Sequence, residues 1–195
     1  MRNWATRAVG ELAHRRDEIN ALNVFPVPDS DTGSNMAHTM EAAVAELENG
    51  GDVADSLALG AVRGARGNSG MVLSQVLRGV AESTVDSVID GDVFARSLQQ
   101  AVELVDRAIA EPVEGTVITV LKAAAEAAND AEAQSGATLH SIVSAAITAA
   151  RMALERTPSQ LPALREAGVV DAGGAGLVIL LESLLAEIEG STGHI

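Results

Sequence analysis

Apolar residues recur every three to four positions along most of the chain, which is the spacing of amphipathic α-helices. The first such segment covers residues 3–20, where Trp4, Ala8 and Leu12 share one face. All five prolines fall where the pattern lapses, so we expect none inside a helix. The pattern predicts about eight helices: residues 3–20, 33–49, 52–61, 69–80 and 91–109, two that begin after Thr116 and Thr138, and a last one over residues 174–188.

The composition strengthens the helical prediction. Alanine is the most frequent residue and aromatic residues make up 2% of the chain. Alanine is the best helix former and allows helices to pack closely, so we predict an all-α domain, most simply an antiparallel bundle. A length of 195 residues is enough for a buried core without disulfides or a structural metal.

The charge of the chain excludes several classes of function. Its formal net charge is −14, and it contains no cysteine. An acidic surface repels phosphate backbones, so we expect neither nucleic acid nor an anionic membrane as a partner. The chain has no signal-peptide core and no apolar run of the ~18 residues that a membrane span needs. We therefore expect a cytoplasmic protein without membrane insertion.

The connection before the second predicted helix contains two aspartates in an extended segment. Two prolines precede Asp29 and Asp31, which alternate so that both carboxylates can point the same way. Paired carboxylates repel unless a cation lies between them. The chain has no cysteine and no HxxxH pair among its histidines, so the shell would be all oxygen, which favours Mg²⁺. Asn23 would add a carbonyl oxygen. Residues 33–35 open a helix, whose N-terminus is an anion site.

An Asp-rich turn in which Asp31 or Thr32 caps the next helix is an equally simple interpretation of this loop. A calcium EF-hand is excluded. Counted from Asp29, the required glycine position is Ser34 and the required glutamate position is Met40.

Three further connections are rich in glycine. Residues 64–70 lack a P-loop lysine; their glycines would let Asn68 and Ser69 approach a phosphate, or would form a flexible helix–helix turn. In residues 169–176, Asp171 or backbone groups would hold a ligand, or the small residues would allow close helix packing. Residues 114–116 are the weakest case, because Gly-Thr before a helix is usually a cap.

The segment over residues 21–36, Ala-Leu-Asn-Val-Phe-Pro-Val-Pro-Asp-Ser-Asp-Thr-Gly-Ser-Asn-Met, resembles the signature loop of the nucleotide-binding domain of bacterial fatty acid kinase. That domain shares a superfamily with the L subunit of dihydroxyacetone kinase. Residues 64–75, 114–116 and 170–174 resemble its further motifs in the same order. The resemblance extends over about residues 3–189.

The resemblance implies an eight-helix antiparallel barrel that binds ATP at one end through two Mg²⁺ ions. The implied metal ligands are Asp29 and Asp31, with Asn23 where dihydroxyacetone kinases have a further aspartate. Ser30 stands where the family has glycine; if positive φ is needed there, serine costs on the order of 1 kcal/mol. Arg165 loosely matches a family arginine near the nucleotide. The implied nucleotide contacts are Thr32, Ser34, Asn35, Asn68, Ser69, Gly115, Thr116, Asp171, Ala172 and Gly173.

These expectations lead to a kinase that transfers the γ-phosphate of Mg-ATP to a fatty acid carboxylate presented by a separate acyl-binding protein. Asp29 and Asp31 act in catalysis through the metal, and an arginine such as Arg66 would stabilise the transferring charge. A carboxylate acceptor is already an anion and needs no general base.

Two alternatives stay open: a glycerone (dihydroxyacetone) kinase phosphoryl donor working with a ketone-binding subunit, and a nucleotide-binding regulatory module without turnover. An acidic helical scaffold, in contrast, predicts no nucleotide binding. We expect residues 1–195 to form one domain, the N-terminal part of a longer chain whose further domains engage the partner. A second copy of the chain is another candidate partner.

Overall fold

The computed structural model describes residues 1–192 of the chain and is all-helical over that range, as predicted. An isolated bridge joins Val85 and Val88 in one connection. The elements are α1 (Arg2–His14), α2 (Arg16–Leu22), α3 (Thr32–Glu46), the 3-10 turn η1 (Leu47–Asn49), α4 (Val53–Gly64), α5 (Gly67–Ser83), α6 (Gly91–Ala108), α7 (Val117–Glu132), α8 (Leu139–Gln160), α9 (Pro162–Ala167) and α10 (Ala172–Thr192).

One predicted helix is divided in the structure, and another is longer than predicted. The segment over residues 3–20 breaks at Arg15, whose φ of −99° and ψ of 11° separate α1 from α2, and the apolar periodicity continues across this break. The helix that begins after Thr138 was expected to end before Pro158 but continues to Gln160 as α8. The short helix α9, which was not predicted, follows with Pro162 in its first turn.

The prediction that no proline lies inside a helix is wrong for Pro158, which sits in the last turn of α8. A proline there cannot donate to the carbonyl of Leu154. The hydroxyl of Thr157 donates to that carbonyl instead, at 2.7 Å. Arg165 donates to the carbonyls of Pro158 and Ser159, so the end of α8 is closed by side chains.

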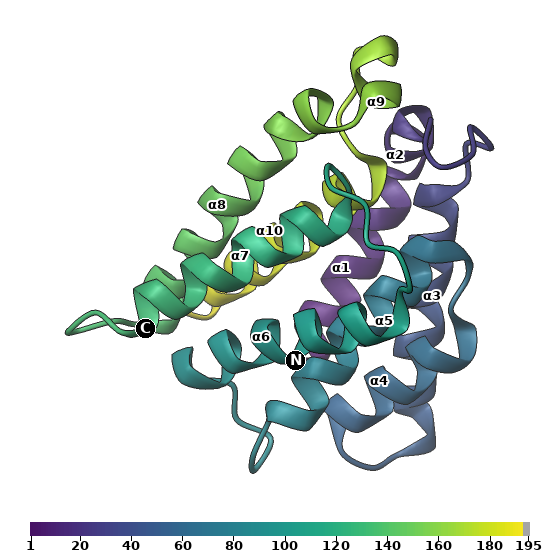
Figure 1. Cartoon of the computed structure of the whole chain (residues 1–195). Helices are drawn as coiled ribbons and strands as arrows, with labels where there is room; N and C mark the ends of the chain where they lie inside the picture. Colours follow the sequence, from purple (N-terminus) through teal and green to yellow (C-terminus); the bar gives the residue numbers. More distant parts are fainter. Residues whose placement is uncertain (193–195) are drawn as a thin grey trace.

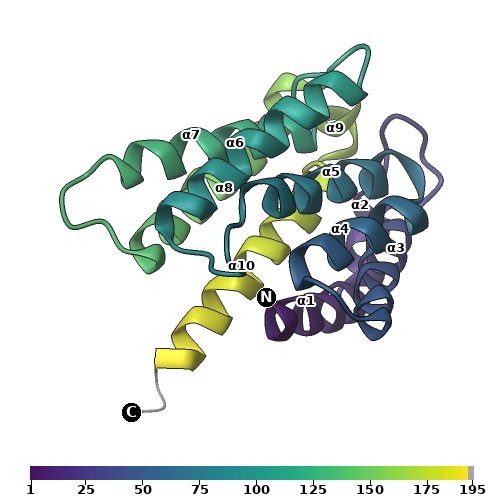
Figure 2. The ribbon, with the colours of Figure 1, turned by 90° about the horizontal axis from the view of Figure 1, so that it is seen from below.

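Eight long helices form a closed ring. Each of α1, α3, α4, α5, α6, α7 and α8 packs against the next, and α10 packs against both α8 and α1 (Figures 1 and 2). The connections are short, so neighbours run antiparallel. Successive connections therefore alternate between the two ends of the ring, which places those before α3, α5, α7 and α10 at the same end.

The interior is divided into two apolar clusters. One centres on α6, α7 and α8, and the other on α1, α3 and α4. Both α5 and α10 contribute to each cluster; in α10, Leu177 belongs to the first and Leu180 to the second. Small residues permit this packing: a side chain at Gly176 would collide with Met36. Among the described residues, no helix is long and apolar enough to cross a membrane.

Candidate functional site

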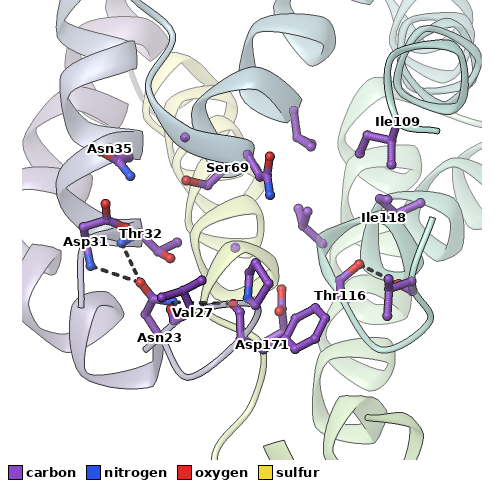
Figure 3. A pocket seen from close by; sticks show the side chains of 18 of the residues that line it. Asn23, Val27, Asp31, Thr32, Asn35, Ser69, Ile109, Thr116, Ile118 and Asp171 are labelled. Atoms are coloured by element: carbon purple, nitrogen blue, oxygen red, sulfur yellow. Dashed lines mark hydrogen bonds between the residues drawn. The ribbon is translucent and has the colours of Figure 1, made fainter. Parts of the chain in front are cut away.

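The four connections at one end of the ring surround a pocket of about 450 Å³ (Figure 3). Most of the residues singled out from the sequence line it. They are Asn23, Asp29, Asp31, Thr32, Asn35, Asn68, Ser69, Thr116, Asp171 and Gly173. The alternation of an antiparallel ring thus brings together motifs that are up to about 150 residues apart in sequence.

Asn23 holds the first loop in shape. Its side chain is 5% exposed, and its Oδ1 accepts from the backbone N–H groups of Asp31 at 3.0 Å and Thr32 at 3.2 Å. Its Nδ2 donates to the carbonyls of Val27 at 3.1 Å and Phe25 at 3.4 Å. Both lone pairs of Oδ1 are therefore engaged. An Asn23 that bound a cation through Oδ1 would have to release one of these N–H groups.

The two aspartates of the loop are, in contrast, unengaged. Within the described part of the chain, the carboxylates of Asp29 and Asp31 make no hydrogen bond or ion pair. Asp31 occupies the N-cap position of α3, but its side chain makes no capping hydrogen bond. Between them, Ser30 has a φ of +55°, the left-handed conformation that favours glycine. The condition under which serine was expected to cost stability at this departure from the family pattern is therefore met.

Free polar side chains continue this wall of the pocket. At the N-terminus of α3 these are Thr32 and Asn35, and at the N-terminus of α5 they are Asn68 and Ser69; over the described residues none of the four side chains has a hydrogen-bond partner. Ser34 differs. Its hydroxyl and its backbone N–H both bond to the amide of Asn20 at 3.0 Å, so it braces α2 against α3 and does not line the pocket.

The opposite wall is apolar and comes mainly from the α6–α7 side (Figure 3). Ile109, Val117 and Ile118 form it together with Val72 of α5. Thr116 donates to the carbonyl of Val113 at 2.7 Å. Gly115 lies behind this wall with a φ of +84°, and its N–H donates to Thr119 at 3.0 Å. Gly115 therefore shapes the turn and does not line the pocket.

Asp171 is buried in the floor of the pocket, 6% exposed. Its Oδ2 accepts from the N–H of Gly174 at 2.7 Å, and its carboxylate also accepts from the N–H of Val117, so it ties the N-termini of α10 and α7 together. Burial raises the pKa of Asp171 to about 6, against the lowering effect of these two hydrogen bonds.

The rest of the 169–176 segment is close packing. Ala172 is buried in the core outside the pocket. A Cβ at Gly173 would lie 3.2 Å from Val117, and one at Gly174 would lie 2.9 Å from Val120. The structure therefore combines the two interpretations of this segment. The carboxylate of Asp171 faces the pocket, and Gly173 and Gly174 allow α10 to pack closely against α7.

The charge of the lining is one-sided. Asp29, Asp31, Glu111 and Asp171 contribute carboxyl groups, and no lysine, arginine or histidine of the described residues lines the pocket. Nor do three or more His, Cys, Asp or Glu side chains of the described residues gather as a metal-binding group. A cation bound here would therefore need oxygen atoms from a ligand to complete its shell.

Several lining residues were not predicted from the sequence. None of them was named as a site residue, although the first four lie in the 21–36 and 64–75 segments; they are Phe25, Pro26, Val27, Val72, Ile109, Glu111, Val113, Val117 and Ile118. The apolar residues on both sides of the Gly115-Thr116 turn were the feature of the sequence that could have indicated an apolar pocket wall there.

Comparison with known proteins gives a consistent family and fold. Residues 26–186 match the family model described as "DAK2 domain". The chain is 41% identical over 187 residues to Protein YloV of Bacillus subtilis, covering 93% of this chain and 34% of that protein. It is 40% identical over 185 residues to the uncharacterized protein SAUSA300_1119 of Staphylococcus aureus, covering 92% and 34%. The chain thus spans about a third of the length of these relatives.

Solved structures share the fold. The dihydroxyacetone kinase from C. freundii in complex with AMP-PNP and Mg²⁺ matches with a TM-score of 0.67 and 20% identity, over 95% of this chain and 33% of that one. The native form of the same kinase matches with a TM-score of 0.65.

Proposed function

Because this chain belongs to the DAK2 domain family, we propose that it binds Mg-ATP in the pocket at the loop end of the ring and donates the γ-phosphate to an acceptor held by another protein. The observation that carries the proposal is the set of unengaged polar side chains on one wall. Asp29 and Asp31 stand free beside the N-termini of α3 and α5, in a pocket whose described lining has no cationic side chain.

The donor chemistry of this wall fits magnesium. Mg²⁺ prefers oxygen and commonly takes one or two carboxylates together with substrate phosphates and waters. Asp29 and Asp31 are such carboxylates. The resemblance implies two Mg²⁺ ions, which this wall would hold together with the phosphates of the nucleotide. Bound there, Mg²⁺ would neutralise and orient the β- and γ-phosphates. In our assignment Asn23 is a positioning residue, because its Oδ1 already holds the loop.

The two walls suggest the direction in which a nucleotide lies. Phosphate oxygens suit the polar wall, where the first N–H groups of α5 and the positive ends of two helix dipoles meet. A purine suits the apolar wall formed by Ile109, Ile118 and Val72. The polar side chains at the starts of α3 and α5 would donate to the phosphates; they are Thr32, Asn35, Asn68 and Ser69. Asp171 would stabilise the floor of the pocket by fixing the start of α7 to the start of α10.

We propose a fatty acid carboxylate as the acceptor, presented by a separate acyl-binding protein. The support is the likeness of residues 21–36 to the fatty acid kinase loop. A carboxylate is already an anion, so its phosphorylation requires no general base in the pocket. The fold shared with the C. freundii dihydroxyacetone kinase supports a second candidate, a phosphoryl donor that works with a ketone-binding subunit.

Thermal unfolding of the chain with Mg²⁺, with ATP, and with both tests the binding step. A ligand at ~100 times its dissociation constant adds about 2.7 kcal/mol to the native state, which shifts the midpoint by roughly 5–10 °C for a domain of this size. We expect that shift with both together and none with ATP alone, because four lining carboxyl groups repel a free nucleotide. No shift under any condition would contradict the proposal.

The acceptor is tested by phosphoryl transfer from labelled ATP, with either an acyl-loaded binding protein or a dihydroxyacetone-loaded subunit added. Transfer to the acyl group supports the fatty acid assignment, and transfer to the ketone supports the second candidate. Binding without transfer to either would instead favour a regulatory module.

A further inference from the structure

No cationic side chain of the described residues lines the pocket, although phosphoryl transfer concentrates negative charge there. Four carboxyl groups line it, and ATP would add about four negative charges. Magnesium ions offset part of this charge, and enzymes of this chemistry commonly add an arginine or lysine at the transferring group. Among the described residues, such a side chain must reach in from outside the lining.

Two arginines near this end of the ring are already engaged. The guanidinium of Arg165 donates to the carbonyls of Pro158 at 3.2 Å and Ser159 at 2.7 Å, which holds it at the end of α8. Arg63 pairs with Glu46 across α4 and α3 at 3.4 Å. Neither guanidinium is turned toward the pocket.

Arg66 has a fixed backbone and a free side chain. Its N–H donates to Thr39 Oγ1 at 3.3 Å, and its carbonyl accepts from Gly70 at 3.0 Å, so the start of α5 is anchored on the buried Thr39. Its side chain is exposed and, over the described residues, makes no hydrogen bond or ion pair.

The position of Arg66 is on the polar wall. It directly precedes Gly67, Asn68 and Ser69, which line the pocket. Gly67 has a φ of +64° and lies so close to Asn35 that a Cβ there would be 2.7 Å from Asn35 Nδ2. The side chain of Arg66 therefore starts from the wall to which we assign the phosphates.

We propose that Arg66 is a catalytic residue that folds over the mouth of the pocket and binds the γ-phosphate of the nucleotide. This inference rests on the proposed function. In the step, an oxygen of the acceptor carboxylate forms a bond to the γ-phosphorus, and the bond from that phosphorus to the β–γ bridging oxygen breaks. The electron pair of the broken bond stays on ADP, no proton moves, and the Arg66 guanidinium remains charged while it binds the equatorial oxygens.

The test compares the affinities of two nucleotides for the whole chain by calorimetry in Mg²⁺. AMP-PNP carries a γ-phosphoryl group and ADP does not. We expect Arg66→Ala to weaken AMP-PNP binding about tenfold, the lower end for a charge-assisted contact, and ADP binding less than about twofold. Arg66→Lys should recover only part of the loss, because an ammonium lacks the bidentate fork.

Arg63→Ala is the matched control, since it removes an arginine three residues away that faces α3. It should leave the ratio of the two affinities unchanged. Equal losses for both nucleotides in Arg66→Ala, or no loss, would overturn the role of Arg66 while the proposed function stands. If the unmodified chain binds neither nucleotide in Mg²⁺, both proposals fall together.

Discussion

The two ends of the ring are both hollow, but they differ in what they do with polar groups. Opposite the loop-end pocket lies a second cavity of about 400 Å³, lined mostly by apolar side chains such as Leu98, Leu177 and Leu184. Polar groups near that cavity bond within the protein: Trp4 Nε1 donates to the carbonyl of Leu180 at 3.1 Å, and Ser97 donates to Val93. At the loop end, in contrast, Asp29, Asp31 and the polar side chains at the starts of α3 and α5 line the pocket without a hydrogen-bond partner among the described residues.

The same structural devices occur at both ends, which makes the comparison testable. Each end has an aspartate at a helix N-cap, a polar side chain that ties a loop, and a residue other than glycine with positive φ. If replacing the same feature at either end changes only stability, that feature has a structural role. If the replacement at the loop end also changes ligand binding, the feature contributes to the candidate site.

The largest expected effect comes from removing a free carboxylate. Asp31→Asn keeps the shape of the side chain and should lower the Mg²⁺-dependent affinity for ATP at least about 100-fold. Replacing an outer-shell partner of a metal ligand already costs up to about 100-fold in metal affinity, and replacing a direct ligand should cost no less. Stability should hardly change, since the side chain makes no capping bond. The affinity is measured by calorimetry and the stability by thermal melting.

Asp55→Asn is the control at the other end. Asp55 is an exposed carboxylate in the first turn of α4. Its replacement changes the net charge equally and should leave ATP affinity unaltered. Equal losses in the two variants would mean that bulk charge, and not a ligand position, governs binding.

The next effect concerns two N-cap aspartates whose pKa values move in opposite directions. Burial raises the pKa of Asp171 to about 6 from 3.8, so its contribution to stability is complete below about pH 3.8 and is lost as pH rises through 6. The loss is at most about 3 kcal/mol. Asp52 is exposed; its hydrogen bond from Ser87, and then those from the backbone, lower its pKa, so its contribution is lost as pH falls.

Urea unfolding between about pH 3 and 7 separates the two caps, because the lowered pKa of Asp52 lies below the ordinary value of an aspartate. The stability advantage of the unmodified chain over Asp171→Asn should shrink as pH rises, whereas its advantage over Asp52→Asn should grow from the acid end. Curves that run parallel for Asp171→Asn would show that its carboxyl group is not perturbed by burial.

A smaller effect is expected from the two side chains that tie loops. Asn23→Ala removes four hydrogen bonds and leaves two backbone N–H groups without an acceptor, so it should cost about 2 kcal/mol and weaken nucleotide binding. Asp52→Ala removes the cap of α4 and the bond to Ser87, and should cost about 1 kcal/mol without affecting binding.

Asn23→Asp distinguishes a positioning role from a ligand role. It keeps an acceptor for Asp31 and Thr32 but loses the donors to Val27 and Phe25. Mg²⁺-dependent affinity should fall in this variant if Asn23 positions the loop. A rise in affinity, as expected for an added anionic ligand, would contradict that assignment.

The sequence allowed us to predict the fold and the grouping of the candidate site residues at one end of the ring, but not the role of each residue within that group. Helical periodicity identified every long helix, because each buries one apolar face. Asn23, Ser34 and Asn35 are equally polar in sequence, yet the side chains of Asn23 and Ser34 bond within the protein, whereas that of Asn35 lines the pocket without a partner among the described residues. That difference depends on contacts between helices that no local pattern encodes, as does the place of Ile109 on the apolar wall.

Three described residues other than glycine have positive φ, and the smallest expected effect comes from two of them, Ser30 at the loop end and Asp86 at the other. Their φ values of +55° and +54° are nearly equal. Glycine removes a strain on the order of 1 kcal/mol but gives back part of it through the entropy of the unfolded chain, so each replacement should stabilise by about 0.5 kcal/mol. Denaturant unfolding of Ser30→Gly and Asp86→Gly measures this gain, and ATP affinity should stay within about twofold in both because neither side chain lines the pocket. A clear loss of stability in Ser30→Gly, with the expected gain in Asp86→Gly, would mean that the Ser30 hydroxyl has a role at the loop end that its backbone conformation does not explain.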